Sequence, residues 1–482
     1  MSSDFGELAL REAEKRGVSY ADIRASEILN ENITVKNGEP ESVTFSQKKG
    51  FGVRVIVNGG WGFAGSIDVN KTELGKTVER AVRIGKASAL LKKKNAVLCK
   101  EEPCKDKYAT SLKKDPFKIQ LNEKLDLLIQ ASRLLREQSP LIKASYAHYR
   151  GFSENKLFMS TEGAEISQQV TWCGGGLSAV AVKGSEMQTR SYPSPFRGDF
   201  STAGYEFFEG LKLVDHAKNV GRELVMLFNA EKCPSGETDL ILCADQLALQ
   251  IHESCGHPTE LDRALGTEAD YAGTSFLTRD KLGKFRYGSD KVNIVADATV
   301  KGGLGTFGYD DEGTKAKQVY LVKKGIFSAY QSSRETAAEL KLGESSGGMR
   351  ADSPSALPII RMTNINLRPG DWKAEEIVED TKDGIMITTN RSWSIDDKRI
   401  NFQFGTEIGW RIKNGSKEKL IKNPTYMGVT PRFWGSCNAV SKDDWKMWGT
   451  PNCGKGVPGQ TMYVGHGCGS ARFSQVRAGL IK

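Results

Sequence analysis

The chain has 482 residues, about three times the length of a common single domain, so we expect more than one compact unit. Hydrophobic residues make up 39% of the sequence and aromatic residues 9%, which excludes a disordered chain. The formal net charge is only +9, and it is spread along the chain without a long basic block. This distribution argues against a nucleic-acid-binding protein, which needs clustered positive charge.

The first residues carry charges from Asp4 onward and are not typical of a signal peptide. Apolar runs stay well short of the roughly 18 residues that a membrane-spanning helix requires. The nine cysteines are odd in number and scattered, a pattern that favours reduced thiols over a disulfide framework. We therefore expect a cytoplasmic protein.

In chain order, the pattern first predicts an amphipathic helix over residues 3–16. Alternating apolar positions then predict strands joined by turns at Asn37-Gly38 and Asn58-Gly59. A second helix is predicted over residues 70–94, and a polar, irregular stretch containing proline follows it. These elements predict an N-terminal α+β domain over residues 1–115.

The next segment begins with a predicted helix over residues 121–137, followed by short strands between residues 141 and 182. A long amphipathic helix is predicted over residues 206–229, and the run Cys233-Pro234-Ser235-Gly236 ends it. We expect a central α/β segment over residues 116–232, packed with the N-terminal domain.

The remaining residues, 233–482, open with a buried-looking strand at 238–243 and a helix at 245–253. From residue 292 onward, strand-like runs separated by Gly, Asn and Pro dominate, which indicates a large antiparallel sheet or barrel. The predicted fold class is α+β: an N-terminal antiparallel sheet with helices, and a C-terminal, largely antiparallel β domain that carries the functional site.

That site is expected at His252-Glu253-Ser254-Cys255-Gly256-His257, an HExxxH arrangement that holds two of only five histidines in the chain. The zinc-protease motif HExxH places its histidines at i and i+4, about 40° apart around a helix. The i+5 spacing here separates them by about 140°, so they would not converge on an ideal α-helix. We expect His252 on the last helical turn and His257 folding back from the loop.

Two histidines do not complete a catalytic zinc site, which usually has three protein ligands. The sequence offers five candidates for the third ligand: Glu260, Asp262, Cys453, His466 and Cys468. Cys453 ranks first because an adjacent cation, Lys455, would favour the thiolate that zinc requires, and the His466–Cys468 pair is its rival. Glu253 would act as general base on a metal-activated water, which makes amide hydrolysis the natural reaction.

These residues resemble the TldD/PmbA family of metalloproteases, once named modulators of DNA gyrase. The resemblance continues beyond the HExxxH stretch and covers most of the chain. Its further motifs are Gly308 to Gly313, Arg361 to Asn364 with Pro369-Gly370, Asn401 to Phe404, and Cys453 to Gly456 with Gln460.

The resemblance implies a zinc site of His252, His257 and Cys453, with Glu253 as the base. It also implies a dimer, either of two copies or with a paralogue that lacks HExxxH, and cleavage of peptides or unfolded polypeptides in an enclosed cleft. In the family pattern the acidic run Asp310, Asp311 and Glu312 lies near that cleft, so we expect it to position substrate. The alternative is that these residues form a solvated turn between glycines.

Broad specificity is expected, because a peptide that adds as a strand to a sheet edge binds through its main chain. Two alternative functions stay open at this point. One is a non-catalytic peptide-binding subunit of a TldD/PmbA-type dimer, which the intact His252, Glu253 and His257 argue against. The other is a nucleic-acid-associated modulator, which the dispersed charge does not favour.

Overall fold

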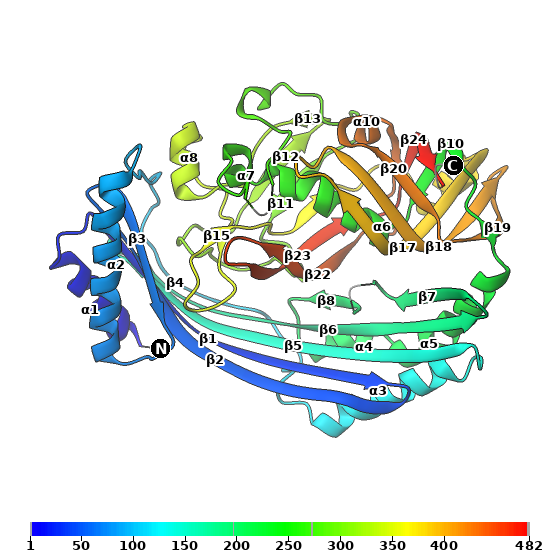
Figure 1. Cartoon of the computed structure of the whole chain (residues 1–482), viewed down its shortest axis with the longest axis horizontal. Coiled ribbons are helices and arrows are strands. Elements are labelled where there is room, and N and C mark those ends of the chain that lie inside the picture. The colour runs from blue at the N-terminus through cyan, green and yellow to red at the C-terminus, as the bar shows by residue number, and fades with distance from the viewer. Residues whose placement is uncertain (1, 196, 271–272, 480–482) are drawn as a thin grey trace.

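The computed structural model describes residues 2–195, 197–270 and 273–479. A long curved sheet runs along one side of the molecule, and the C-terminal half of the chain packs over one face of that sheet (Figure 1). Within the described ranges, no helix is both long enough and apolar enough to cross a membrane.

The first sheet has the strand order β3-β2-β1-β5-β6-β4, with β7 and β8 also paired to β6. Its long strands are β1 (Tyr20–Lys36), β2 (Glu39–Val57), β5 (Ile142–Ser160) and β6 (Glu165–Lys183). The shorter strands are β3 (Gly60–Ser66), β4 (Lys105–Ala109), β7 (Glu186–Tyr192) and β8 (Asp199–Ser201). The pairings are antiparallel apart from β4, which runs parallel to β6.

Asn-Gly pairs form the two predicted turns of this sheet. Asn37 and Gly38 join β1 to β2 with φ of 54° and 80°, and Asn58 and Gly59 join β2 to β3 with φ of 49° and 75°. Two successive residues with positive φ give the turn whose twist matches that of antiparallel strands. These turns therefore set the register of the sheet that underlies the site.

Helices cover both ends of the first sheet (Figure 1). They are α1 (Ser3–Glu14) and α2 (Lys71–Leu91) at one end, and α3 (Leu121–Arg136), α4 (Tyr205–Gly210) and α5 (Leu213–Met226) towards the other. The predicted start of α2 is confirmed, because the Asn70 side chain accepts a hydrogen bond from the Glu73 N–H at 2.9 Å. Each end has its own apolar core, one including Val53 and Leu74 and the other Leu128.

The second large sheet belongs to the C-terminal half and has the order β17-β10-β24-β20-β18-β19-β9, with β21 also paired to β24. Its strands are β9 (Glu231–Lys232), β10 (Gly236–Leu242), β17 (Asp383–Ile395), β18 (Asn401–Lys413), β19 (Ser416–Lys422), β20 (Thr425–Val429), β21 (Cys437–Val440) and β24 (Ala471–Ala478). Because β17 pairs with both β10 and β18, the sheet closes on itself. The predicted sheet or barrel is thus a closed sheet.

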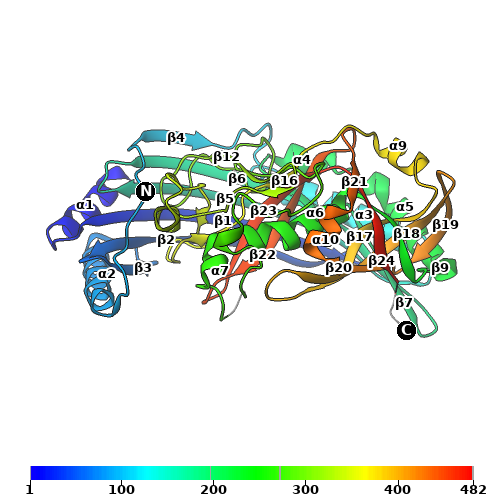
Figure 2. The same ribbon diagram turned by 90° about the horizontal axis from the view of Figure 1, so that it is seen from above.

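Smaller sheets and short helices complete this half. The strands are β11 (Ile294–Asp297), β12 (Gln318–Lys323), β13 (Ile326–Phe327) and β16 (Ile365–Leu367), the pair β14 (Met349–Arg350) and β15 (Ile359–Ile360), and the hairpin β22 (Lys446–Lys455) and β23 (Gln460–Cys468). The helices are α6 (Ala244–Ile251), α7 (Leu261–Leu265), α8 (Arg334–Leu340), α9 (Ala374–Glu379) and α10 (Thr430–Gly435). Figure 2 shows α6 beside the β22–β23 hairpin in the middle of the molecule, where both help form the largest apolar core.

The predicted α+β class is confirmed, with differences in detail. The stretch after the second helix, predicted as irregular, contributes β4 to the first sheet, where it pairs with β6. The short strands predicted between residues 141 and 160 are one continuous strand, β5, because Gly151 pairs with both Glu31 of β1 and Cys173 of β6. The single helix predicted over 206–229 is broken into α4 and α5 at Lys212, whose φ is 50°. A residue in the left-handed region cannot continue a right-handed helix.

Candidate metal centre

The two histidines of the HExxxH stretch are joined by a wide helical turn. Helix α6 ends at Ile251, and residues 252–256 form a π-helical turn in which the backbone N–H of His257 bonds to the carbonyl oxygen of His252. This i→i+5 bond brings the two residues together, and their ring centroids lie 4.9 Å apart. The expectation that His257 folds back from a loop was wrong: a wider helical turn accommodates the extra residue.

Local chemistry explains the wide turn. Pro258 has no N–H with which to bond the carbonyl oxygen of Ser254, and the Tyr287 hydroxyl donates to that oxygen instead, at 2.8 Å. Gly256 lies so close to Met362 that a Cβ atom there would be 2.3 Å from the Met362 sulfur. The turn therefore depends on Gly256, which has no side chain, and on Pro258, which has no backbone N–H.

His252 and His257 meet Cys453, which strand β22 supplies from almost 200 residues downstream. One ligand atom from each of the three residues lies within 4.8 Å of the others, and Cys453 Sγ is 3.8 Å from His257 Nε2. All three residues are buried. Across the described ranges, this is the one group of three or more His, Cys, Asp or Glu side chains with such geometry.

The remaining hydrogen bonds orient both imidazoles towards this shared space. His466 Nδ1 lies 3.3 Å from the Ile365 carbonyl oxygen, and His466 Nε2 lies 2.8 Å from His252 Nδ1. A carbonyl accepts only, so His466 Nδ1 donates, His466 Nε2 accepts from His252 Nδ1–H, and His252 Nε2 keeps its lone pair. His257 Nδ1 lies 2.9 Å from Glu260 Oε2, which likewise leaves His257 Nε2 free.

The other candidates for the third ligand lie outside the three-residue group. His466 and Glu260 contact the two histidines from behind. Asp262 accepts two hydrogen bonds of 2.8 Å from Lys455, and the Cys468 thiol donates to the Ala244 carbonyl oxygen at 3.1 Å. Contacts such as those of His466 and Glu260 fix the tautomer and orientation of a histidine that binds metal.

The charge states of the group suit metal binding. Burial lowers the pKa of His252 and His257, so both imidazoles are neutral near neutral pH. Burial alone would raise the pKa of the Cys453 thiol, but the charge of the nearby Arg361 guanidinium opposes this, and the pKa is lowered. Neutral imidazole and thiolate are the forms that bind metal.

The cation beside Cys453 is not the predicted one. Lys455 is fully buried and pairs with Asp262, whereas Arg361 donates to the Cys453 carbonyl oxygen at 2.5 Å and lowers the thiol's pKa. A second arginine that the sequence reasoning missed, Arg399, pairs with Glu253 through Nη1 and Oε2. Both arginines come from segments distant in sequence, and no local signal singles out Arg399.

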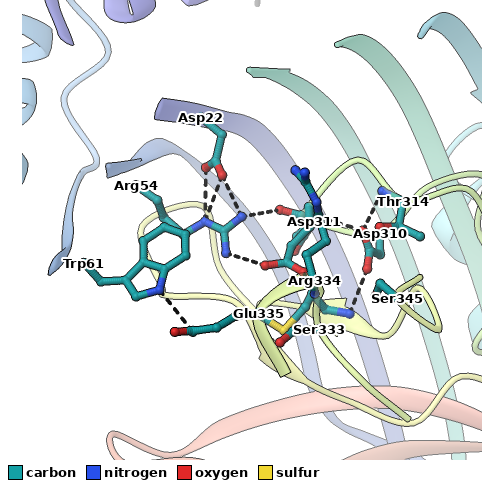
Figure 3. A network of polar contacts seen from close by, with 12 residues as sticks. Asp22, Arg54, Trp61, Asp310, Asp311, Thr314, Ser333, Arg334, Glu335 and Ser345 are labelled. Carbon is teal, nitrogen blue, oxygen red and sulfur yellow. Dashed lines mark hydrogen bonds and ion pairs between the residues drawn. The ribbon is translucent and has the colours of Figure 1, made fainter. Parts of the chain in front are cut away.

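The acidic run at residues 310–312 lies in a network between the first sheet and the C-terminal half (Figure 3). Asp311 pairs with Arg24 at 2.7 Å and also with Lys156, and Glu312 pairs with Arg54 at 3.0 Å.

The third member of the run, Asp310, accepts backbone N–H bonds from Glu312, Thr314 and Met349. All three acidic residues are buried, so the alternative of a solvated turn is wrong. Burial, together with the neighbouring Glu312, raises the pKa of Asp310 to about 8. Their carboxylate oxygens form hydrogen bonds and ion pairs with other residues of this chain. A substrate-positioning role stays a prediction.

A cavity of about 300 Å³ lies between the first sheet and the β22–β23 hairpin. It is lined by residues 32–34 of β1, residues 148–150 of β5, Arg197, Phe200, and by Pro451 and Asn452, which directly precede Cys453. A larger groove of about 630 Å³ lies over β18, β20 and β24 and contains none of the predicted site residues.

Comparison with known proteins finds models of one family along most of the chain. The PmbA/TldA metallopeptidase C-terminal domain matches residues 235–479, domain 1 matches residues 21–85, and the central domain matches residues 114–228. The longest match includes every residue of the candidate metal centre.

Two curated relatives match nearly the whole chain. A metalloprotease of Methanocaldococcus jannaschii is 32% identical over 455 residues, 94% of this chain and 95% of the relative. A protein of Saccharolobus solfataricus named zinc metalloprotease TldD homolog is 24% identical and covers 98% of each chain.

Solved structures share the fold. A putative modulator of DNA gyrase from Thermotoga maritima has a TM-score of 0.77 at 17% identity, with 99% of this chain and 100% of that chain covered. TldE from Thermococcus kodakarensis has a TM-score of 0.70 at 15% identity, with coverage of 98% and 99%.

Proposed function

The chain belongs to the PmbA/TldA (TldD/PmbA) metallopeptidase family, and on this premise we propose that it is a zinc-dependent peptidase acting on peptides or unfolded polypeptides. In this proposal His252, His257 and Cys453 hold the zinc ion, and Glu253 is the general base. The single observation that carries it is the buried group of three ligand atoms beside Glu253.

The donor set fits zinc. Two neutral imidazoles and a thiolate are ligands that zinc accepts, and three protein ligands leave one position open, as in catalytic zinc sites. The Saccharolobus solfataricus relative named as a zinc enzyme supports the same metal. When bound, zinc would supply Lewis acidity, which lowers the pKa of water and polarises a carbonyl oxygen.

The chain's own residues would handle the proton. Glu253 Oε2 is held by Arg399, which leaves Oε1 as the atom to accept a proton from the attacking water. The same oxygen would then deliver that proton to the amine nitrogen of the leaving peptide. His466 and Glu260 would keep the two imidazoles in the tautomers that direct Nε2 towards the metal.

The cavity next to Pro451 and Asn452 supports an approach of substrate between the first sheet and the hairpin that carries Cys453. An extended peptide lying there would be held largely through its main chain, which favours broad sequence specificity. The acidic run would position substrate indirectly. Its members, Asp310, Asp311 and Glu312, lie in the network that joins the first sheet to the C-terminal half, and this network would fix the width of the space that the peptide enters.

The test of the proposed function separates metal binding from chemistry. Zinc content and cleavage of an unfolded substrate such as denatured casein would be measured for wild type, Glu253→Gln and Cys453→Ser. Glu253→Gln should keep about one zinc per chain and lose turnover by several orders of magnitude, while Cys453→Ser should lose zinc. Cys468→Ser is the matched control, because Cys468 lies on the same hairpin but outside the ligand group. This variant should keep both its zinc and its turnover.

We also propose that the free edge of β2 forms an interface between two copies of the chain. Residues 39–49 of β2 are all exposed, and β3 pairs with β2 only from Phe51 onward. The segment has Glu39 and Glu41 near one end and Lys48 and Lys49 at the other, so an antiparallel arrangement of two copies would place acids opposite lysines.

The oligomeric state tests this interface. Mass measurement in solution should give a dimer for wild type and a monomer for Lys48→Glu/Lys49→Glu. Adding Glu39→Lys/Glu41→Lys to that variant restores opposite charges and should restore the dimer. A wild type that is monomeric at micromolar concentration, or a charge-swapped variant that stays monomeric, would contradict the proposal. Dimerisation with a paralogue instead would appear as mixed dimers when such a subunit is added.

A further inference from the structure

Arg399 occupies a turn between β17 and β18 with a backbone φ of 64°. Left-handed backbone is unfavourable for a residue with a side chain and persists where the surroundings impose it. Asp396 holds the turn from inside, accepting N–H bonds from Ile400 at 2.8 Å and from Asn401 at 3.1 Å. From outside, the Thr430 hydroxyl donates to the Arg399 carbonyl oxygen at 2.9 Å.

The guanidinium of Arg399 is only partly used. Its Nη1 bonds Glu253 Oε2, and the two side chains are 16% and 7% exposed. Its Nε is buried without a hydrogen-bond partner. Among the described residues, the hydrogen bond that its side chain donates is the one from Nη1 to Glu253. A guanidinium carries five N–H donors in a rigid fork, so one part of this fork holds Glu253 while another is available to a ligand.

We propose that Arg399 is a second catalytic residue of the hydrolysis: it holds the Glu253 carboxylate through Nη1 and donates from one of its remaining N–H groups to the carbonyl oxygen of the peptide bond being cleaved. This inference rests on the proposed function, because it requires Glu253 to be the base. The ion pair brings the guanidinium next to the base, and the substrate carbonyl must lie within reach of the water that this base deprotonates.

The electron and proton balance is that of ordinary amide hydrolysis. The water oxygen bonds to the carbonyl carbon, the π electron pair moves to the carbonyl oxygen, and the water proton moves to Glu253 Oε1. The Arg399 N–H stabilises the negative charge that develops on the substrate carbonyl oxygen. A preformed donor in a water-poor site does this effectively. The electron pair then returns, the carbon–nitrogen bond breaks, and the amine nitrogen takes the proton from Glu253.

The backbone conformation of Arg399 makes the experiment sharp. Glycine adopts a positive φ without strain, so Arg399→Gly removes the donor while relaxing the turn. We expect kcat to fall about 100- to 1000-fold, the usual loss for one donor to a developing oxyanion, with KM changed less than about threefold. Zinc content should stay at the wild-type level. The melting temperature should fall, because Glu253 stays buried without its cation and relief of the strained turn offsets only part of that loss.

Two further samples tie the loss to the guanidinium. Free guanidinium ion added to Arg399→Gly should recover at least about tenfold in kcat, because it can occupy the vacated space with the same donors. Lys398→Ala alters the exposed neighbour in the same turn and should stay within about twofold of wild type. A comparable loss of kcat in Lys398→Ala would overturn the assignment, as would zinc loss in Arg399→Gly.

The outcomes for Arg399 and Glu253 are separable. If Glu253→Gln loses turnover with zinc retained and Arg399→Gly keeps a kcat within about threefold of wild type, the role of Arg399 is refuted and the proposed function stands. If zinc-loaded Glu253→Gln cleaves as fast as wild type, the proposed function falls and the role of Arg399 falls with it.

Discussion

Arg54 is the central cation of the network that joins the first sheet to the C-terminal half, and its removal is the most informative test of what holds the two together. Its guanidinium bonds Asp22 with contacts of 3.1, 3.0 and 2.6 Å and Glu312 with one of 3.0 Å. All three side chains are at most 5% exposed. Arg54→Met therefore leaves two buried carboxylates without their shared cation.

Breaking a buried ion pair by removing one partner costs about 3–5 kcal/mol, because the remaining charge stays buried and uncompensated. We expect the free energy of unfolding of Arg54→Met to fall by about that amount. Urea unfolding measures it, and the indole of Trp61 gives a local signal because its ring lies 5.3 Å from the Arg54 guanidinium carbon. Circular dichroism follows the rest of the chain in parallel.

Two companion variants test the reasoning. Arg80→Met removes an exposed arginine that is 3.8 Å from Glu73, and it should change stability by less than about 0.5 kcal/mol. Asp22→Asn/Arg54→Met/Glu312→Gln removes all three charges together and should recover most of the loss, since neutral replacement of a buried ion cluster is often nearly neutral in stability. A loss below about 1 kcal/mol in Arg54→Met would refute the reasoning, and so would a triple variant no more stable than Arg54→Met.

Three predictions concern the metal centre. His466→Ala should weaken zinc binding about 10- to 100-fold in a competition assay with a chromophoric chelator, because His466 sets the tautomer of His252, the proposed ligand; an unchanged dissociation constant would contradict this. In metal-free protein near neutral pH, iodoacetamide should modify Cys453 before Cys255, because burial raises the pKa of Cys255 to about 12 whereas that of Cys453 is lowered, so Cys453 holds more thiolate; peptide mapping that finds Cys255 first would disagree. Gly256→Ala should destabilise the protein by about 1–3 kcal/mol in thermal unfolding, and Met362→Ala in the same chain should recover part of it, because the added Cβ meets the Met362 sulfur; no destabilisation would argue against a tight turn.

The fold was predictable where a local signal sets the backbone. Asn37-Gly38 gave the first hairpin because an Asn-Gly pair adopts two positive φ angles easily. The continuity of β5 through Gly151 was not predictable, because pairing to strands on both sides overrides the low strand propensity of glycine. The domain boundaries placed at residues 115 and 232 stay predictions.

The candidate site divides in the same way. His252, Glu253 and His257 stand together in the sequence, so their spacing alone marked them. Cys453 was one of five candidates, and it is the one that the fold places beside the histidines. The cation that acts on its thiol could not be identified, because Arg361 reaches Cys453 only through the tertiary packing of distant segments.

The i+5 spacing of the histidines, which does not fit an α-helix, matches the π-helical turn that the chain forms at residues 252–256. A motif that converges at i+4 on an α-helix can converge at i+5 only if the turn is wider, and a π-helical turn provides that width. Gly256 permits the close approach to Met362, and Pro258 removes a donor that an α-helical continuation would need. HExxxH at residues 252–257 thus keeps the same order of histidine, glutamate and histidine as HExxH, with the added residue taken up by the turn.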